Sequence, residues 1–378
     1  MPPRKPIVIV LIVVMLLIAV LFAYYAVYTW LIPSIPSEIV KDMEELPFSG
    51  WCTNPTWSPD GSRIAYERSR DIYIVDWDGG NGRWLVEGID DARDPVWSPN
   101  GSKIAFIMEG RIESISPDGD SRETLMDLSE LMDPLDPSIS SLTWSPDGSM
   151  LVFEMSLHVQ DESEDSMESG AETNDDIWVF AIDSGDLRQL TTHPESDRDP
   201  MWNPDSQRIA FISDRAGDHW DIWVTDIEGN ELWQLTTNPG LDWEPSWSPD
   251  GTQIAFASGH DTNIWVMDAD GSNKRQLTES SADNHHPAWN PNGSMIAFDS
   301  TSFGPVGDIW LMHSDGSEKT RLTDASRFKP SFSCNSPWIQ YHTPMWSPDG
   351  TKILFIEGTH DGHTVIQYDG FWVMELQR

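Results

Sequence analysis

Short apolar runs alternate with polar turns along most of this chain from about residue 50 onward. In the clearest unit, Trp247 begins a Trp-Ser-Pro-Asp-Gly segment, apolar runs follow at Ile254 to Phe256 and Ile264 to Met267, and Gln-Leu-Thr ends the unit at Thr278. Runs of this length, rich in β-branched and aromatic residues and bounded by Asp-Gly, are typical of strands joined by tight hairpins. The unit therefore predicts four antiparallel strands.

The same unit occurs seven times, with its tryptophans 40 to 58 residues apart. Periods in this range indicate repeat architectures in which each unit packs on its neighbours. We predict an all-β fold, a seven-bladed β-propeller of four-stranded antiparallel blades. Large aromatic residues in the first and third strands are expected to fill the wedges between blades, which accounts for most of the 20 tryptophans. The repeat tryptophans are Trp57, Trp97, Trp144, Trp202, Trp247, Trp289 and Trp346.

The seventh unit contains only three of its four expected strands. After the run that begins at Gly370, the sequence leaves no residues for a fourth. An unpaired sheet edge is exposed to unwanted pairing, so a segment from elsewhere should cover it. We predict that part of Met43 to Phe48 supplies this strand and closes the ring.

A run of 26 uncharged residues, from Ile7 to Ile32, precedes the repeats. It is long enough to span a bilayer, so we predict a transmembrane helix at 7–32, a cytoplasmic stub at 1–6, a linker at 33–50 and the propeller at 51–378. Arg4 and Lys5 come before the run and acidic residues follow it, which favours a cytoplasmic amino terminus and an extracytoplasmic propeller. A cleaved signal peptide is the alternative.

The repeat resembles the WD40-like PD40 repeat of the TolB family of propellers, which also occurs in the propeller domains of prolyl oligopeptidase-type and tricorn-type peptidases. The resemblance covers residues 50–378 and implies the fold. It does not imply a function, because one fold supports many activities. TolB has an amino-terminal α/β domain and six blades, whereas this chain has a hydrophobic segment and seven repeats, so the role of TolB is not transferred.

The chain carries 62 acidic and 23 basic residues, a net charge of −39. Such a surface excludes nucleic acid as a partner, since phosphate binding needs basic residues. A cationic partner, divalent ions or adaptation to high salt would each explain it. The densest acidic stretch, Asp161 to Asp176, is interspersed with Gly and Ser and is predicted to be a loop between two strands of the third blade.

Two cysteines are too few for a disulfide scaffold or a cysteine-based metal site. Cys52 and Cys334 precede the first strands of blades 1 and 7, which ring closure makes neighbours. An exported domain permits a disulfide between them, and two separate thiols are the alternative.

The four-stranded unit places short, similar turns on one face of the disc and long, varied connections on the other. Binding residues are expected on the varied loop face. Aligning the units on their tryptophans picks out the residue three positions earlier, where each innermost strand begins at the mouth of the central channel. This axial ring consists of Asn54, Asp94, Ser141, Asp199, Glu244, His286 and Thr343.

The axial ring combines carboxylates, an imidazole and neutral oxygen-bearing side chains. Such groups can bind a hard cation such as Ca²⁺, or the amine or guanidinium of a protein or peptide partner. His285 and His342 lie beside the ring in sequence and are candidates to join it. The alternative is that these are ordinary hydrated residues.

The chain lacks the G-x-S-x-G, H-E-x-x-H, Gly-rich phosphate-loop and C-x-x-C motifs. We therefore predict a membrane-anchored, non-enzymatic binding or scaffold protein with a protein, peptide or glycan partner. The alternative is a propeller hydrolase or lyase that uses Asp94, Asp199, Glu244, His286 and a divalent cation at the channel mouth.

Overall fold

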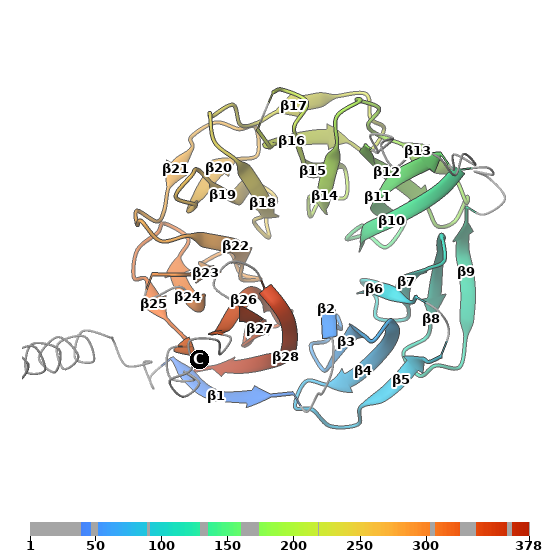
Figure 1. Cartoon of the computed structure of the whole chain (residues 1–378), viewed down its shortest axis with the longest axis horizontal. Coiled ribbons are helices and arrows are strands. Elements are labelled where there is room, and N and C mark those ends of the chain that lie inside the picture. Colours follow the sequence, from blue (N-terminus) through green and yellow to red (C-terminus); the bar gives the residue numbers. More distant parts are fainter. Residues whose placement is uncertain are drawn as a thin grey trace, which may run out of the picture.

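The computed structural model describes residues 39–46, 52–88, 91–128, 135–159, 174–217, 219–302, 307–325, 338–360 and 365–377. These residues form seven four-stranded antiparallel sheets arranged as blades around a central axis (Figure 1). The predicted all-β, seven-bladed propeller is therefore confirmed.

The blades follow one another along the chain, and each uses four consecutive strands except the last. Blade 1 contains β2 (Cys52–Trp57), β3 (Arg63–Arg68), β4 (Asp71–Asp76) and β5 (Arg83–Val86). Blade 2 contains β6 (Arg93–Trp97), β7 (Ile104–Met108), β8 (Arg111–Ile115) and β9 (Arg122–Asp127). Blade 3 contains β10 (Leu135–Trp144), β11 (Met150–Val159), β12 (Asp175–Ala181) and β13 (Leu187–Gln189).

The second half of the ring repeats this arrangement. Blade 4 contains β14 (Asp197–Trp202), β15 (Arg208–Ser213), β16 (Asp221–Asp226) and β17 (Leu232–Gln234). Blade 5 contains β18 (Asp242–Trp247), β19 (Gln253–Ser258), β20 (Asn263–Asp268) and β21 (Arg275–Gln276). Blade 6 contains β22 (Asn284–Trp289), β23 (Met295–Ser300), β24 (Asp308–His313) and β25 (Thr320–Arg321). Blade 7 contains β26 (Trp338–Trp346), β27 (Lys352–His360) and β28 (Val365–Leu376), completed by β1 (Val40–Glu45).

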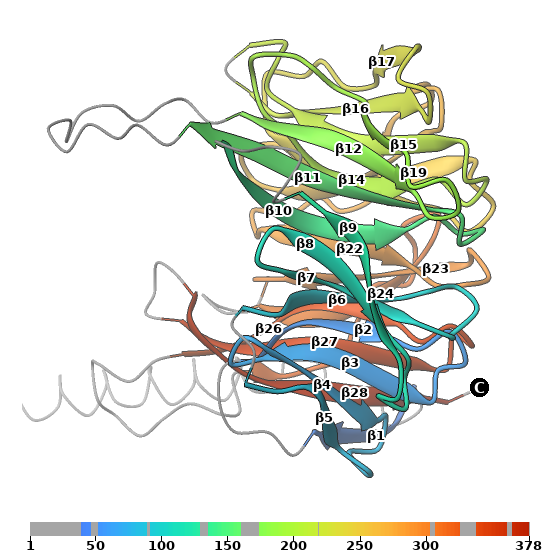
Figure 2. The same ribbon diagram turned by 90° about the vertical axis from the view of Figure 1, so that its right-hand side faces the viewer.

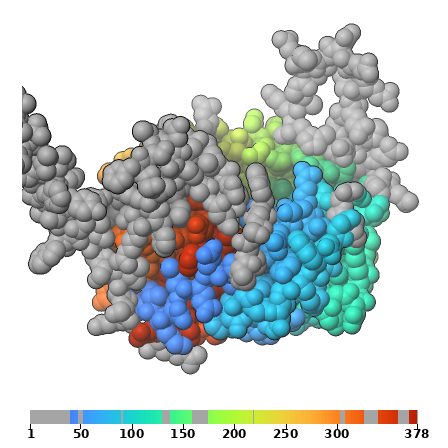
Figure 3. Space-filling view, turned by 60° about the horizontal axis from the view of Figure 1, so that its bottom comes forward, coloured from blue at the N-terminus to red at the C-terminus, as the bar shows by residue number. Residues whose placement is uncertain are grey.

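Strand β1 closes the ring by pairing antiparallel with β28, from Val40 opposite Leu376 to Glu45 opposite Trp372. Figure 3 shows the blue amino-terminal residues against the red carboxyl-terminal ones at the outer surface. The segment expected to close the ring, Met43 to Phe48, overlaps β1 at Met43 to Glu45. Residues 47–50 lie outside the described part of the chain.

The turn face, on the right in Figure 2 near the carboxyl terminus, carries the hairpins that follow the repeat tryptophans. In blade 5, the Ser248 hydroxyl donates to Asp250 at 2.6 Å and accepts from the Gln253 N–H at 2.9 Å, while Asp250 accepts from the Thr252 N–H at 3.0 Å. Gly251 completes the turn with φ of 68°. Pro-Asp-Gly recurs because proline fixes one turn dihedral and glycine accepts positive φ.

The recurrent Leu-Thr after the fourth strand has a structural role as well. In blade 4, Thr236 Oγ1 accepts from the Ile222 N–H at 2.9 Å and donates to Asp221 at 3.1 Å. The same arrangement recurs in blades 3, 5 and 6, around Thr191, Thr278 and Thr323. In these four blades the threonine side chain replaces a missing ladder bond at the start of the third strand.

The hydrophobic core lies between blades. The second-strand aromatic residues, such as Phe256, are buried, and six of the seven repeat tryptophans are nearly so, while Trp346 is partly buried. Five of those tryptophans also donate Nε1–H to a backbone carbonyl of the preceding blade; Trp247, for example, donates to Met201 at 3.2 Å. Tryptophan is thus used because it fills the wedge and bonds the neighbouring blade at once.

Candidate functional site

The seven axial ring residues occupy equivalent places in the innermost strands, and all have φ between 50° and 54°. The register of the first two strands shifts at this point in every blade, which marks a β-bulge. Bulges re-aim side chains, and a non-glycine residue with positive φ is uncommon. Because all seven blades share the bulge, it belongs to the fold, and function depends on which side chain each blade places there.

Three further carboxylates, which the sequence alignment missed, lie beside the ring. They follow the buried aromatic residue of the second strand, where blades 2, 4, 5 and 7 have Ile or Ala. Strand pairing places each of them opposite the residue just before a ring residue. An acidic residue inside an otherwise apolar strand was the signal that could have found them. They are Glu67, Glu154 and Asp299.

Carboxylates connect adjacent blades around the axis. Glu154 of blade 3 accepts from the Asp199 N–H of blade 4 at 2.5 Å, and Glu244 of blade 5 accepts from the His286 N–H of blade 6 at 2.6 Å. Asp299 of blade 6 likewise accepts from the Thr343 N–H of blade 7 at 3.2 Å. These bonds hold the bulges of neighbouring blades in a fixed relation.

The first three ring residues are connected in a similar way. The Asn54 side-chain amide donates to the carboxylate of Asp94. Asp94 in turn accepts from the backbone N–H of Ser141, whose hydroxyl bonds Glu154. The predicted ring residues therefore fall into two hydrogen-bonded series, one from Asn54 to Asp199 and one from Glu244 to Thr343. The two meet in an axial cluster, where Glu244 and His286 act electrostatically on Asp199.

His286 is the charged centre of the cluster. Its Nδ1 lies 2.7 Å from Asp299 Oδ1, and its Nε2 lies 3.4 Å from Glu244 Oε1. Burial lowers the pKa of His286, but Asp299, Glu244 and Asp199 outweigh burial and raise it to about 9. Asp299 is also buried, yet the histidines around it keep its pKa below the usual range. His286 is therefore an imidazolium at neutral pH.

The two flanking histidines differ from each other. Burial lowers the pKa of His342 to about 4, against the opposing effect of Asp299, so this ring is neutral; its Nδ1 is 2.9 Å from Thr343 Oγ1. His285 lies 3.4 Å from Glu244, and that carboxylate raises its pKa in spite of burial. The rings of His285 and His342 lie 6.0 and 6.2 Å from that of His286, measured between centroids.

Burial raises the pKa of four axial carboxyl groups above their ordinary values. In Glu67 and Asp199 a neighbouring carboxylate adds to the effect of burial, Asp94 in the first case and Glu244 in the second. Arg93 and Arg198 oppose these shifts only in part. The other two groups are Asp94 and Glu154. Negative charge is thus concentrated at the axis, which favours a cation.

A cavity of about 330 Å³ opens beside the cluster, between blades 1, 6 and 7. Asn54, His286, His342 and Thr343 line it, together with Thr53, Gln340 and Ile356. Ring residues from opposite ends of the chain therefore share one cavity, which the closure by β1 and β28 makes possible.

A family model described as TolB beta propeller domain matches residues 138–326, which is 189 of the 378 residues. The chain belongs to the TolB beta-propeller family. No curated protein sequence matches the chain.

Solved structures similar to this TolB-family propeller include enzymes. An oligogalacturonate lyase in complex with manganese is 15% identical with a TM-score of 0.68, covering 89% of this chain and 93% of that one. Oligogalacturonate lyase from Vibrio parahaemolyticus is 14% identical, with a TM-score of 0.63 and coverage of 90% and 92%. A puromycin-hydrolyzing peptidase of Mycobacterium tuberculosis is 14% identical, with a TM-score of 0.61 and coverage of 83% and 53%. At these identities the similarity shows the fold alone.

Other predicted features of this TolB-family chain are only partly described. Cys52 is a buried free thiol, whose pKa burial raises to about 11, and it forms no disulfide in the structure; Cys334 lies outside the described residues. The same holds for most of the acidic stretch at 161–176 and for the apolar run at 7–32. Within the described ranges, no helix is long and apolar enough to cross a membrane. Within the same described residues, no group of three or more His, Cys, Asp or Glu side chains is arranged to hold a metal ion such as the Ca²⁺ considered above.

Proposed function

We propose that this protein is a membrane-anchored, extracytoplasmic binding module, and that its axial cluster receives a positively charged group of a protein or peptide partner. The observation that carries the proposal is the set of four axial carboxyl groups whose pKa values burial raises. A bound ammonium or guanidinium would donate charge-assisted hydrogen bonds to these carboxylates and offset the repulsion between them.

The overall charge supports the same partner. A net charge of −39 attracts cations over distances comparable to the Debye length and repels polyanions. Within the described residues, Arg93 and Arg198 are the arginines that act on the axial carboxyl groups with raised pKa values, and Arg198 is also paired with Asp175 at 2.6 Å. These two arginines and the His286 imidazolium, which also lowers the pKa of Asp199, offset the axial carboxylates only in part, so the axis can still accept an added positive charge.

The direction of β1 supports the proposed orientation. The chain enters β1 at Val40, opposite Leu376, close to the turn of Asp349 and Thr351 on the turn face. The ring residues lie at the beginnings of the innermost strands, on the loop face. If residues 7–32 span a membrane, the axial cluster points away from it. Labelling of intact cells with a membrane-impermeant amine reagent tests the extracytoplasmic location of the propeller, because Lys274 and Lys319 are exposed and would be modified only outside.

Binding of a trilysine peptide to the full-length chain tests the axial site by calorimetry. The double variant Asp199→Asn/Glu244→Gln should weaken binding about tenfold or more, since two charge-assisted contacts are removed. The matched control is Asp270→Asn/Asp315→Asn, which removes the same charge from exposed turns on the other face and should have a much smaller effect. Equal losses in the two double variants would refute an axial site.

A hydrolase or lyase is the second candidate, favoured by the contact of His286 with Asp299 and Glu244. With a pKa of about 9, His286 would donate a proton as a general acid, whereas a metal ligand or general base must be neutral. We therefore place it second. Incubation with oligogalacturonate, with and without manganese, and measurement of new C=C absorbance would promote it if activity appeared and was lost in His286→Gln.

A further inference from the structure

An arginine in the outermost strand of blade 1 bonds that blade to the next one. Arg83 donates Nη1–H to the carbonyl of Asp118 at 3.0 Å, and its Nη2 donates to the carbonyl of Pro117. Both carbonyls belong to the outer turn of blade 2, which joins the third and fourth strands of that blade. The planar fork of a guanidinium suits two successive carbonyls better than the point charge of an ammonium does.

Two other blades repeat this contact at the same register. Arg188 of blade 3 pairs with the carboxylate of Glu228 in the outer turn of blade 4. Arg275 of blade 5 donates to the carbonyl of Ser314 in the outer turn of blade 6 at 2.8 Å. In all three blades, the arginine lies opposite an Ile or Val of the third strand. An outer turn that binds the guanidinium of the preceding blade is therefore a recurrent feature of this propeller.

Blade 4 departs from this pattern because a tryptophan occupies the arginine position. Trp233 of β17 lies opposite Val224 of the third strand, as the arginines lie opposite their partners. The indole has one N–H donor and no positive charge, so it cannot reproduce the arginine contacts. The side chain is 42% exposed, and no aromatic ring or cation within the described ranges stacks on it. Trp233 thus leaves the junction between blades 4 and 5 open to solvent.

The outer turn of blade 5 offers the acceptors that the arginines use elsewhere. Ala269 and Asp270 precede the turn glycine, at the places that Pro117 and Asp118 hold in blade 2. Asp270 also corresponds to Glu228 of blade 4, so this one turn offers both the kind of carbonyl bonded in blade 2 and the kind of carboxylate bonded in blade 4. Among the residues that the structure describes, none donates to the carbonyl of Ala269 or of Asp270.

A rim cavity of about 180 Å³ opens between Trp233 and this turn, beside the outermost strand β17 (Figure 1). Asp270 lines it and is exposed, and hydrogen bonds from Ser272 keep the pKa of its carboxyl group below the ordinary value. The cavity therefore combines a carboxylate with largely apolar walls. These walls are formed by Val224, Trp233, Leu235 and Ala269.

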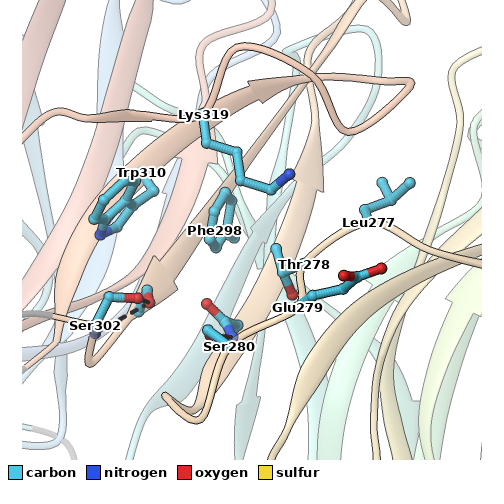
Figure 4. A pocket seen from close by; sticks show the side chains of 10 residues that line it. Leu277, Thr278, Glu279, Ser280, Phe298, Ser302, Trp310 and Lys319 are labelled. Carbon is cyan, nitrogen blue, oxygen red and sulfur yellow. Dashed lines mark hydrogen bonds between the residues drawn. The ribbon is translucent and has the colours of Figure 1, made fainter.

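The cations near the rim cavity leave room for another one. Arg208 also lines it, but its Nη2 lies 2.9 Å from Asp205, which offsets its charge. A larger cavity of about 390 Å³ in blade 6 differs, because Lys319 lines it and the ammonium is bonded to a neutral carbonyl, that of Gly316 (Figure 4). An added cation is therefore better accommodated between blades 4 and 5 than in blade 6.

We propose that the rim cavity binds an arginine side chain of a partner protein. The guanidinium would stack on Trp233, since tryptophan is the aromatic residue that binds cations best, and would donate to the carbonyl of Ala269 and the carboxylate of Asp270. The net charge of −39 favours such a cation over an anion. The site is separate from the axial cluster and does not depend on the function proposed for it.

Calorimetry of the full-length chain with N-acetyl-arginine amide tests the rim cavity. Trp233→Arg introduces the residue of blades 3 and 5, which should bond the same turn from within and lower the affinity about tenfold or more. The matched control is Leu232→Arg, which adds the same charge to the other face of β17 and should keep the affinity within about twofold of the parent. Both side chains are 42% exposed, so neither variant removes a buried core residue.

The individual contacts can be tested with the same probe. Asp270→Asn should weaken binding about two- to fivefold, because it removes one exposed charge-assisted contact. Trp233→Leu should have an effect of about the same size, because it removes the aromatic face. N-acetyl-citrulline amide lacks the charge and N-acetyl-lysine amide lacks the planar fork, so both should bind less tightly than the arginine probe.

The titrations are repeated in the axial variant Asp199→Asn/Glu244→Gln. This variant should leave the affinity of the rim cavity unchanged, so failure of one site is distinguishable from failure of the other. If the axial cluster also binds the probe, Trp233→Arg should remove one bound molecule and the axial variant another. The proposal is overturned if Trp233→Arg binds the probe as well as Leu232→Arg does, or if citrulline binds as tightly as arginine.

Discussion

The turn face and the axial ring are both repeated seven times, but they differ in how much their side chains vary. At the turns, the first residue is Ser or Asn and the third is Asp or Asn in every blade. At the ring, the backbone is equally uniform, with φ from 50° to 54°, yet the side chains include Asn, Asp, Ser, Glu, His and Thr. The turns therefore share their side-chain types, whereas the ring residues share only their backbone conformation.

This difference separates residues that stabilise the fold from residues that are free to bind. The turn side chains satisfy backbone groups that have no ladder partner, so a change there costs stability. The ring side chains extend from bulges toward the axis. Two of them, Asp94 and Asp199, have carboxyl pKa values above the ordinary one, so their negative charge is disfavoured in the folded state. Substitutions at the uniform positions should therefore affect stability, and substitutions at the ring should affect binding.

The largest effect is expected at a uniform position in the core, Thr236→Val. Thr236 is fully buried, and the substitution leaves the Ile222 N–H without its acceptor while preserving side-chain shape. An unsatisfied buried donor costs about 1–3 kcal/mol, so the free energy of unfolding should fall by that amount in chemical denaturation. Thr343→Val, the same change in the partly exposed ring, should cost less. Equal losses would contradict the distinction between uniform, buried positions that satisfy backbone groups and the variable positions of the ring.

The second largest effect on stability is expected from acid, acting on the turn carboxylates. Burial raises the pKa of Asp349, but bonds from Ser347 and Thr351 outweigh it and lower the pKa from 3.8 to about 2. A carboxyl group with a depressed folded-state pKa stabilises the protein above its unfolded pKa, and that contribution is lost as pH falls from 3.8 through 2. Asp349→Asn should therefore flatten the decline of melting temperature over this range. Blades 2 and 6 already have Asn100 and Asn292 at this position.

The sequence predicted the number of blades and the ring because one tryptophan per blade served as a fixed reference. Pro-Asp-Gly determines the hairpin, and the hairpin determines where the strand before it lies, so residues three positions upstream of each tryptophan are equivalent in space. Turns defined by a few neighbouring residues in this way can be predicted from a single sequence.

The sequence did not reveal Glu154 and Asp299, because their position depends on register across two strands and on a bulge. Strand pairing is what places these two carboxylates beside the ring, because Asp299 lies opposite His285 and Glu154 lies opposite Ser140.

The imidazolium of His286 should make a smaller contribution to the free energy of unfolding, and this contribution is lost at alkaline pH. Burial opposes its charge, but Asp299 and the neighbouring carboxylates raise its pKa from 6.5 to about 9. A raised histidine pKa stabilises the folded state below pH 6.5, and this stabilisation is lost as pH rises from 6.5 through 9. Urea denaturation across this window should show declining stability in the parent and a flatter profile in His286→Gln. A parent profile as flat as that of the variant would show that His286 is not charged by its neighbours.

The smallest effect on stability is expected from Asp199→Asn, although this residue belongs to the proposed binding site. Burial and Glu244 raise the pKa of Asp199, so its charge opposes folding at neutral pH, and the amide removes that charge. The melting temperature should be unchanged or slightly higher, while affinity for trilysine falls. If the ring serves to bind a ligand, substitutions at its residues should weaken binding without destabilising the fold. Marked destabilisation by Asp199→Asn would instead place the axial carboxylates among the structural residues, together with the turns.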